Sequence, residues 1–188
     1  IVMRSRITID KGFIEKAINL KFIARVGSGT ENFDCEYLKE KKIELISSGE
    51  GNSNAVGEHA LGLLLSLSKK ITKSNIEMKN GIRKREENRG FEIEGKTIGL
   101  IGYGKTGKSF AKKLSGFNCN IIFCDIKTNL GDNYAREVKI NELKETSDII
   151  SLHTNLNQSS RHIIDKQFID DCKKSFCLIN TARGECIS

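Results

Sequence analysis

The chain has 188 residues, enough for one large or two small domains, and 38% of them are hydrophobic, which suffices for a buried core. Its net charge of +7 admits nucleic-acid binding, but the basic residues are scattered and mixed with acidic ones, which is more typical of a lysine-rich surface. No apolar run approaches the roughly 18 residues of a membrane span. The six cysteines show no C-x-x-C pairing, so we expect reduced thiols in a cytoplasmic protein, without a metal site.

The first part of the chain alternates short strands and helices. Apolar spacing predicts strands near residues 1–3, 22–26 and 43–46, and helices near 10–20 and 34–41. A turn is expected over 47–53. One long helix is then expected over about 54–78, as a bridge between two units, and we place the domain boundary at residue 75.

From Lys96 the pattern restarts as a regular alternation of strand and helix. Strands are predicted near 97–102, 120–125, 148–152 and 176–180, and helices near 106–116, 141–146 and 165–171. Such alternation implies right-handed βαβ units and a parallel sheet. The predicted fold class is therefore α/β, with a Rossmann-type sheet in residues 76–188.

A glycine motif stands where the first of these strands meets its helix. Gly102, Gly104 and Gly107 form G-x-G-x-x-G. In this pattern the first glycine permits the tight turn, the second lets the backbone approach a pyrophosphate, and the third allows close packing of helix on strand. The amides of Lys105 and Thr106 would lie at the helix N-terminus, which attracts phosphate.

An acidic residue ends the second strand. Asp125 lies eighteen residues after Gly107, near the spacing of about 20 expected for a ribose-binding carboxylate. A carboxylate there accepts hydrogen bonds from ribose hydroxyls and repels a 2′-phosphate, which favours NAD over NADP. Lys127 weakens that preference slightly. A ligand-free glycine turn remains the alternative interpretation.

Other polar residues follow predicted strands, where parallel sheets bind ligands. Arg183 follows the last strand and could grip a substrate carboxylate, or be a plain surface arginine. Gly29 and Asn52 lie in loops that suit a small anion, although simple turn chemistry explains them equally well. The three histidines, His59, His153 and His162, have no evident carboxylate partner, and we assign none of them as an acid–base group.

Taken in order, several blocks of the chain resemble the D-2-hydroxyacid dehydrogenase family, and its phosphoglycerate-oxidising branch above all. Arg4-Ser5 resembles the family's R-S-x-T, and residues 20–32 resemble its L-K-x-I-x-R-x-G-x-G-x-D-N. Residues 51–59 resemble its G-N-x-x-x-V-A-E-H, and residues 95–104 its cofactor strand. Further family blocks match residues 147–154 and 179–184, so the likeness runs nearly end to end.

The resemblance implies an NAD-dependent oxidoreductase acting on a D-2-hydroxy acid, most closely 3-phosphoglycerate, with glycerate or erythronate 4-phosphate as alternatives. It implies a flavodoxin-like substrate domain, present in part, before the cofactor domain, and a homodimer joined through the cofactor domain. Arg183 would be catalytic, binding the carboxylate and polarising the reacting carbonyl. The implied substrate-binding residues are Arg4, Ser5, Gly29 and Asn52. The implied cofactor-binding residues are Gly102, Gly104, Lys105, Thr106, Gly107, Asp125, Thr154, Thr181 and Ser48.

The chain also departs from the family pattern. The family's catalytic glutamate and histidine lie downstream of the arginine motif, beyond Ser188, and the sequence starts partway into the family's first domain. Prolines usual after Ser48 and Thr154 are replaced by Gly49 and Asn155. We therefore expect the 188 residues alone to be inactive or nearly so. A non-catalytic NAD-binding or regulatory module of the same superfamily is the alternative.

Overall fold

A computed structural model describes residues 1–4 and 6–188. The chain divides into two compact units, Ile1–Ser53 and Asn54–Ser188. Within the described residues, no helix is both long enough and apolar enough to cross a membrane.

The described part of the first unit holds a small parallel sheet in the order β1-β2-β3. Its elements are β1 (Val2–Met3), α1 (Lys11–Lys16), β2 (Phe22–Arg25), α2 (Cys35–Glu40) and β3 (Glu44–Ser47). Both helices begin after an aspartate whose carboxylate accepts a backbone N–H of the first turn: Asp10 from Phe13 at 2.8 Å and Asp34 from Tyr37 at 2.9 Å. Such N-caps satisfy backbone donors that a helix leaves unpaired.

Two helices stand where one long bridging helix is predicted, and the first of them starts earlier than predicted. Helix α3 (Gly49–Ser68) begins where the sequence predicts a turn, and α4 (Ile71–Lys79) follows as a separate helix. The prediction of one helix over 54–78 is therefore wrong. The break occurs because Lys70 adopts a left-handed conformation with φ of 52°, which cannot continue a right-handed helix.

Residues 54–188, all of which are described, form a parallel sheet of five strands in the order β6-β5-β4-β7-β8. This confirms the predicted parallel sheet. The strands are β4 (Thr97–Ile101), β5 (Asn120–Cys124), β6 (Arg136–Glu137), β7 (Ile149–Leu152) and β8 (Cys177–Asn180). The helices are α5 (Lys105–Leu114), α6 (Ile140–Thr146) and α7 (Lys166–Asp171), with short 3₁₀ turns η1 (Ser115–Phe117) and η2 (Gly184–Cys186). The two-residue edge strand β6 was not predicted.

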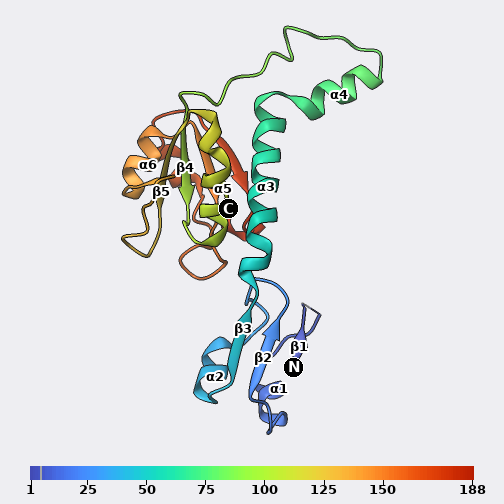
Figure 1. Cartoon of the computed structure of the whole chain (residues 1–188), viewed down its shortest axis with the longest axis vertical. Coiled ribbons are helices and arrows are strands. Elements are labelled where there is room, and N and C mark those ends of the chain that lie inside the picture. Colours follow the sequence, from blue (N-terminus) through green and yellow to red (C-terminus); the bar gives the residue numbers. More distant parts are fainter. Residues whose placement is uncertain (5) are drawn as a thin grey trace. The chain divides into compact units, whose positions relative to one another are not determined.

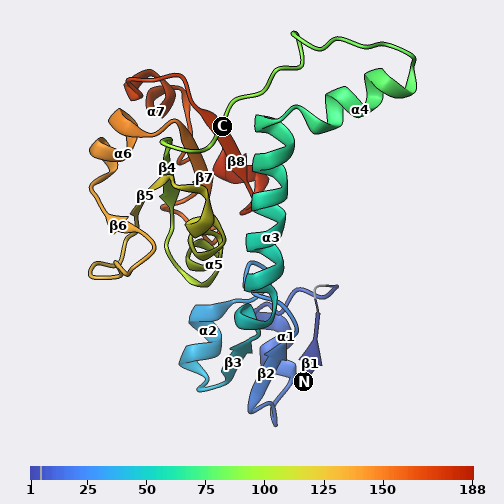
Figure 2. The same cartoon turned by 45° about the horizontal axis from the view of Figure 1, so that its top comes forward.

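Helices cover both faces of this sheet, as Figures 1 and 2 show. Leu64 of α3 and Phe110 of α5 pack in the apolar cluster on one face, and Leu143 of α6 and Phe168 of α7 pack in the cluster on the other. Helix α3 approaches α5 closely at Gly57, where a Cβ atom would lie 2.6 Å from the Ser109 hydroxyl. The sheet is thus buried on both sides, which accounts for the continuous apolar runs of its central strands.

The strand order places a topological switch between β4 and β7. The chain runs from β4 outward to β5 and β6, then returns to β7 on the other side of β4 and continues to β8. In open α/β sheets, ligands bind outside the carboxyl ends of the strands at such a point. The glycine motif follows β4 directly and therefore lies at this switch.

Candidate dinucleotide-binding site

Two of the three motif glycines are required by packing. Gly102 has φ of +94°, and a Cβ there would lie 2.7 Å from the carbonyl oxygen of His153, just after β7. A Cβ at Gly107 would lie 2.4 Å from the carbonyl oxygen of Gly102. Real Cβ contacts are not this short, so both positions admit only glycine without a backbone shift. The turn and the close approach of α5 to β4 follow from these two residues.

Gly104 differs, because nothing in the protein lies within 4 Å of the Cβ that it lacks. It is the N-cap of α5, with φ of −76°, and its position carries no side-chain capping bond. The space beside it is thus open at a helix N-terminus, where the Lys105 and Thr106 amides begin the helix. This is the cradle that a pyrophosphate needs and that a side chain would fill, so these residues fit the phosphates of NAD.

Asp125 lies immediately after β5, beside the glycine loop. Its carboxylate accepts the backbone N–H of Tyr103 at 2.6 Å and that of Lys127 at 2.9 Å. A carboxylate has about four lone-pair sites, so two remain for the ribose hydroxyls. The Tyr103 amide therefore holds the Asp125 carboxylate beside the glycine motif, and its contact with a ribose stays a prediction.

Two threonines mark the ends of the neighbouring strands. The Thr181 hydroxyl, after β8, donates to the carbonyl oxygen of Leu152 at 3.3 Å, and the Thr154 hydroxyl, after β7, lies 3.7 Å from the Cys186 sulfur. Because β7 pairs with both β4 and β8, these residues belong to the same carboxyl edge as the glycine loop. Their contact with a cofactor stays a prediction.

Arg183 follows β8 in a turn shaped by Asn180. The Asn180 side chain donates to the carbonyl oxygen of Arg183 at 2.8 Å and accepts the N–H of Ala182 at 2.9 Å. The Arg183 guanidinium donates to the carbonyl oxygen of Ala182 at 2.8 Å. The structure therefore places the predicted catalytic arginine at the carboxyl edge of the sheet, on a turn held by its own side chains.

The first unit carries the remaining predicted residues. Ser48, just after β3, accepts the N–H of Gly27 at 2.9 Å and so ties the glycine-containing turn after β2 to the end of β3. Gly29 is buried and Arg4 is exposed. Asn52 lies exposed in the first turn of α3 and not in a loop, which corrects the prediction of a turn there. Ser5 lies outside the described residues.

Arg25, which the sequence pattern did not identify as a site residue, has an unusual environment. It ends β2, and its Nε and Nη1 atoms are buried without a hydrogen-bond partner among the described residues. The guanidinium lies 5.7 Å from the Phe33 ring centroid and packs against Gly27. Buried guanidinium nitrogens without a hydrogen-bond partner are costly unless they meet an anion. The sequence signal for Arg25 was a positively charged residue at the end of an apolar strand.

His153 is a structural residue. It is buried, its Nε2 lies 2.9 Å from the Ser151 hydroxyl, and its ring packs on Phe110. Burial lowers the pKa of His153 to about 4, so the ring is neutral at physiological pH.

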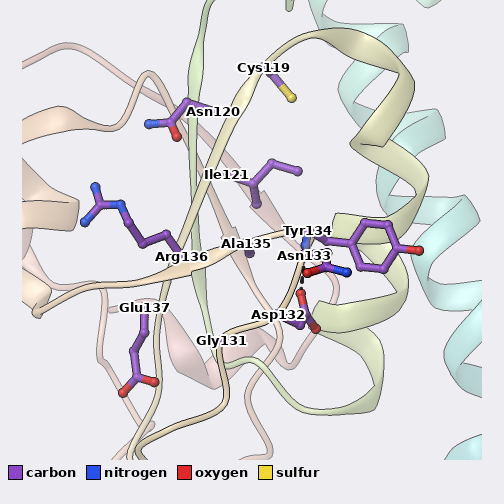
Figure 3. Close-up of a pocket in the computed structure, with 10 residues that line it drawn as sticks. All are labelled: Cys119, Asn120, Ile121, Gly131, Asp132, Asn133, Tyr134, Ala135, Arg136 and Glu137. Carbon is purple, nitrogen blue, oxygen red and sulfur yellow. Dashed lines mark hydrogen bonds between the residues drawn. The ribbon is translucent and has the colours of Figure 1, made fainter.

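A hollow of about 630 Å³ lies beside the edge strand β6. Figure 3 shows the start of β5, with Asn120 and Ile121, and the segment from Gly131 to Glu137 around it. Because Asn120 is the first residue of β5, this hollow reaches the amino end of the sheet. The dinucleotide is expected at the opposite, carboxyl edge.

Comparison with known proteins identifies relatives over nearly the whole chain. The family model described as "D-isomer specific 2-hydroxyacid dehydrogenase, NAD binding domain" matches residues 61–188. A hydroxypyruvate reductase of Thermotoga maritima is 36% identical over 98% of this chain, which spans 60% of that relative. A D-3-phosphoglycerate dehydrogenase of Methanocaldococcus jannaschii is also 36% identical over 98% of this chain, which spans 36% of that relative.

A solved structure agrees with the fold. An acyclic imino acid reductase, in complex with NADPH and D-Arg, superposes with a TM-score of 0.91 at 30% identity. The match covers 100% of this chain and 61% of the reductase chain. The chain thus spans between about a third and two thirds of the length of these three proteins.

Proposed function

The chain belongs to the D-isomer specific 2-hydroxyacid dehydrogenase family, and on that premise we propose that it forms part of an NAD-dependent dehydrogenase that oxidises 3-phosphoglycerate to 3-phosphohydroxypyruvate, a step of serine biosynthesis. The relative from M. jannaschii carries the corresponding name. The equally similar relative from T. maritima is named for hydroxypyruvate, which has no phosphate. The choice between them therefore rests on this chain's own residues.

The observation that carries the choice is Arg25. Its buried Nε and Nη1 lack partners among the described residues, which favours an anionic ligand at the end of β2. Arg4 and Arg6, close by in the sequence after β1, are exposed cations in the same unit. A phosphorylated acid offers two anionic groups where lactate or glycerate offers one.

When bound, NAD would accept a hydride from C2 of the hydroxy acid, while the hydroxyl proton passes to a base, which the family pattern places downstream of Arg183. The protein's part is to hold the reactants: Gly104 and the first turn of α5 would bind the pyrophosphate, and Asp125 the adenine ribose. The Arg183 guanidinium would bind the substrate carboxylate through two parallel hydrogen bonds and polarise the bond between C2 and its oxygen. We propose residues 1–75 as part of the substrate-binding domain and residues 76–188 as the cofactor domain.

The test is a calorimetric titration of the chain, in saturating NADH, with 3-phosphoglycerate, D-glycerate and D-lactate. We expect 3-phosphoglycerate to bind at least about tenfold more tightly than the other two, because charge-assisted contacts to phosphate add roughly 1.5–3 kcal/mol. Arg25→Gln should remove most of that preference, and Lys21→Gln, an exposed change at the other end of β2, should not. Equal affinity for the three acids would rule out the phosphoglycerate assignment.

We also propose that two copies of the chain associate through α4. No residue of α4 is buried, and Ile71, Ile76 and Met78 are each more than half exposed. Both views show the helix projecting away from the sheet (Figures 1 and 2). Sedimentation equilibrium should give a dimer that Ile76→Glu dissociates; a monomeric parent chain at micromolar concentration would contradict this.

A further inference from the structure

Tyr103 is a loop residue with a core side chain. It lies between Gly102 and Gly104 in the motif, yet none of it is exposed to solvent. Its ring stacks on Phe123 of β5, with centroids 3.9 Å apart and planes inclined by 11°. Aromatic stacking of this kind adds to the apolar burial, so the glycine loop is anchored to the face of the sheet by this one ring.

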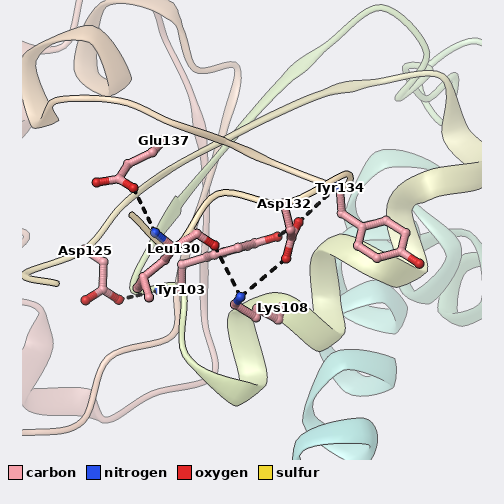
Figure 4. Close-up of polar contacts among 7 residues, drawn as sticks. All are labelled: Tyr103, Lys108, Asp125, Leu130, Asp132, Tyr134 and Glu137. Carbon is pink, nitrogen blue, oxygen red and sulfur yellow. Dashed lines mark hydrogen bonds and ion pairs between the residues drawn. The ribbon is translucent and has the colours of Figure 1, made fainter. Parts of the chain in front are cut away.

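The Tyr103 hydroxyl makes a second attachment. It donates to the Asp132 carboxylate at 2.7 Å, and the same carboxylate accepts the N–H of Tyr134 at 2.9 Å. Lys108 of α5 lies 3.5 Å from Asp132, donates to the carbonyl oxygen of Leu130 at 3.2 Å and stands over the Tyr103 ring. Figure 4 shows these contacts joining the glycine loop, α5 and residues 130–134. We call Tyr103, Lys108 and Asp132 the tyrosine clasp.

The protonation states favour the clasp at physiological pH. Burial and the Asp132 hydrogen bond raise the pKa of the Tyr103 hydroxyl well above its usual range. Burial raises the pKa of Asp132, but the bonds from Tyr103 and Tyr134 and the charge of Lys108 outweigh it, so its pKa is lowered overall. A protonated phenol thus donates to an ionised carboxylate, which makes a charge-assisted bond.

Tyr103 also contacts Asp125, the carboxylate proposed to bind the ribose. The backbone N–H of Tyr103 donates to Asp125, while the hydroxyl of the same residue holds Asp132. Leu130 is fixed between them, since its N–H donates to Glu137 at 3.1 Å. The exposed residues 126–129 are therefore tethered at both ends to one tyrosine.

We propose that Tyr103 and Asp132 are positioning residues, which hold the glycine loop and the Asp125 carboxylate in the arrangement that binds the adenine ribose and excludes a 2′-phosphate. This inference rests on the proposed NAD site. Neither side chain needs to touch the cofactor, because each acts through the loop and the carboxylate that it fixes.

The decisive variant is Tyr103→Phe, which keeps the stacked ring and removes only the hydroxyl. We expect it to weaken NADH binding by a factor of about 3 to 10 and to reduce the preference for NADH over NADPH, with faster amide hydrogen exchange in residues 126–132. Tyr134→Phe is the matched control, since it removes a phenol from the same segment but keeps the backbone N–H bond to Asp132. Asp132→Asn should act like Tyr103→Phe, and the double variant should be no worse than either single one.

Calorimetry with NADH and NADPH separates the outcomes. If the parent chain binds neither dinucleotide, the proposed cofactor site fails and this inference with it. If the parent binds NADH and a folded Tyr103→Phe variant keeps both its affinity and its NADH preference, only the clasp is refuted. Strictly additive effects of Tyr103→Phe and Asp132→Asn would also refute it, because the two would then not act as a pair.

Discussion

Gly104→Ala should separate cofactor binding from stability. The residue has an allowed φ of −76° and no protein atom within 4 Å of a new Cβ. Two small effects oppose each other: a less flexible unfolded chain stabilises by about 0.4–1 kcal/mol, and a poorer N-cap costs about 0.5–1 kcal/mol. The free energy of unfolding should therefore stay within about 0.5 kcal/mol of the parent.

Binding should respond very differently. The new methyl group occupies the space that the pyrophosphate approaches, and an inserted methyl in a tight site costs about 1–3 kcal/mol. NADH affinity should therefore fall about 5- to 150-fold. Calorimetry is the suitable assay, because the chain has no tryptophan for a fluorescence signal.

Two further alanine variants serve as controls for the effects of Gly104→Ala on stability and on NADH binding. Gly107→Ala places its Cβ 2.4 Å from a backbone oxygen and should lower the free energy of unfolding by about 1–3 kcal/mol in urea. Gly116→Ala meets nothing within 4 Å and lies outside the motif, so it should change neither property. Gly104 does not border the pyrophosphate if Gly104→Ala binds NADH like the parent, and its space is not open if the variant destabilises the protein as much as Gly107→Ala.

Three further outcomes are expected. Asp125→Ser should shift the ratio of NADPH to NADH affinity towards NADPH by about tenfold, measured by calorimetry, because it removes the charge that repels a 2′-phosphate; an unchanged ratio would show that Asp125 does not discriminate. Asp148 accepts the N–H of Thr97 at 2.9 Å and pairs with Lys174 at 3.3 Å. Burial raises its pKa, but these contacts outweigh that and lower it overall. Its stabilisation is therefore present above the ordinary carboxyl pKa and is lost as pH falls through the lowered value. Asp148→Asn should thus lower the free energy of unfolding by about 1–2 kcal/mol at pH 7, measured in urea, and this difference from the parent should shrink in acid. A difference that grew in acid would mean that the pKa of Asp148 is raised and not lowered. Lys42→Gly should raise the free energy of unfolding by about 0.5–1 kcal/mol, since Lys42 has φ of 57° after α2, and a lower thermal midpoint would contradict this.

The sheet of the second unit was predictable because its strands are short apolar runs separated by helical spacing. Strand β6 was not, because Arg136 and Glu137 are both polar and are recognisable as a strand only by pairing with β5. The helix break at Lys70 carries no glycine or proline to announce it. Local pattern therefore specified the buried elements and missed those that depend on a partner or on a single backbone angle.

The candidate site likewise has residues that local spacing predicts and residues that depend on tertiary packing. Spacing identified Gly102, Gly104 and Asp125 as candidates, because residues of this kind act through the backbone or from a strand end. The contact between Tyr103 and Asp132 spans 29 residues and arises only when β5 and its following loop fold back over the motif. Arg25 was visible as a charge in an apolar strand, but its unpaired state depends on packing.

The central claim is that this chain carries an NAD site whose carboxylate rejects NADP. The acyclic imino acid reductase, of very similar fold, was solved with NADPH, so the choice of dinucleotide depends on the site in this chain. A calorimetric titration of the unmodified chain with NADH and with NADPH tests it directly. NADH should bind more tightly by at least about tenfold; tighter binding of NADPH, or binding of neither, would contradict the account.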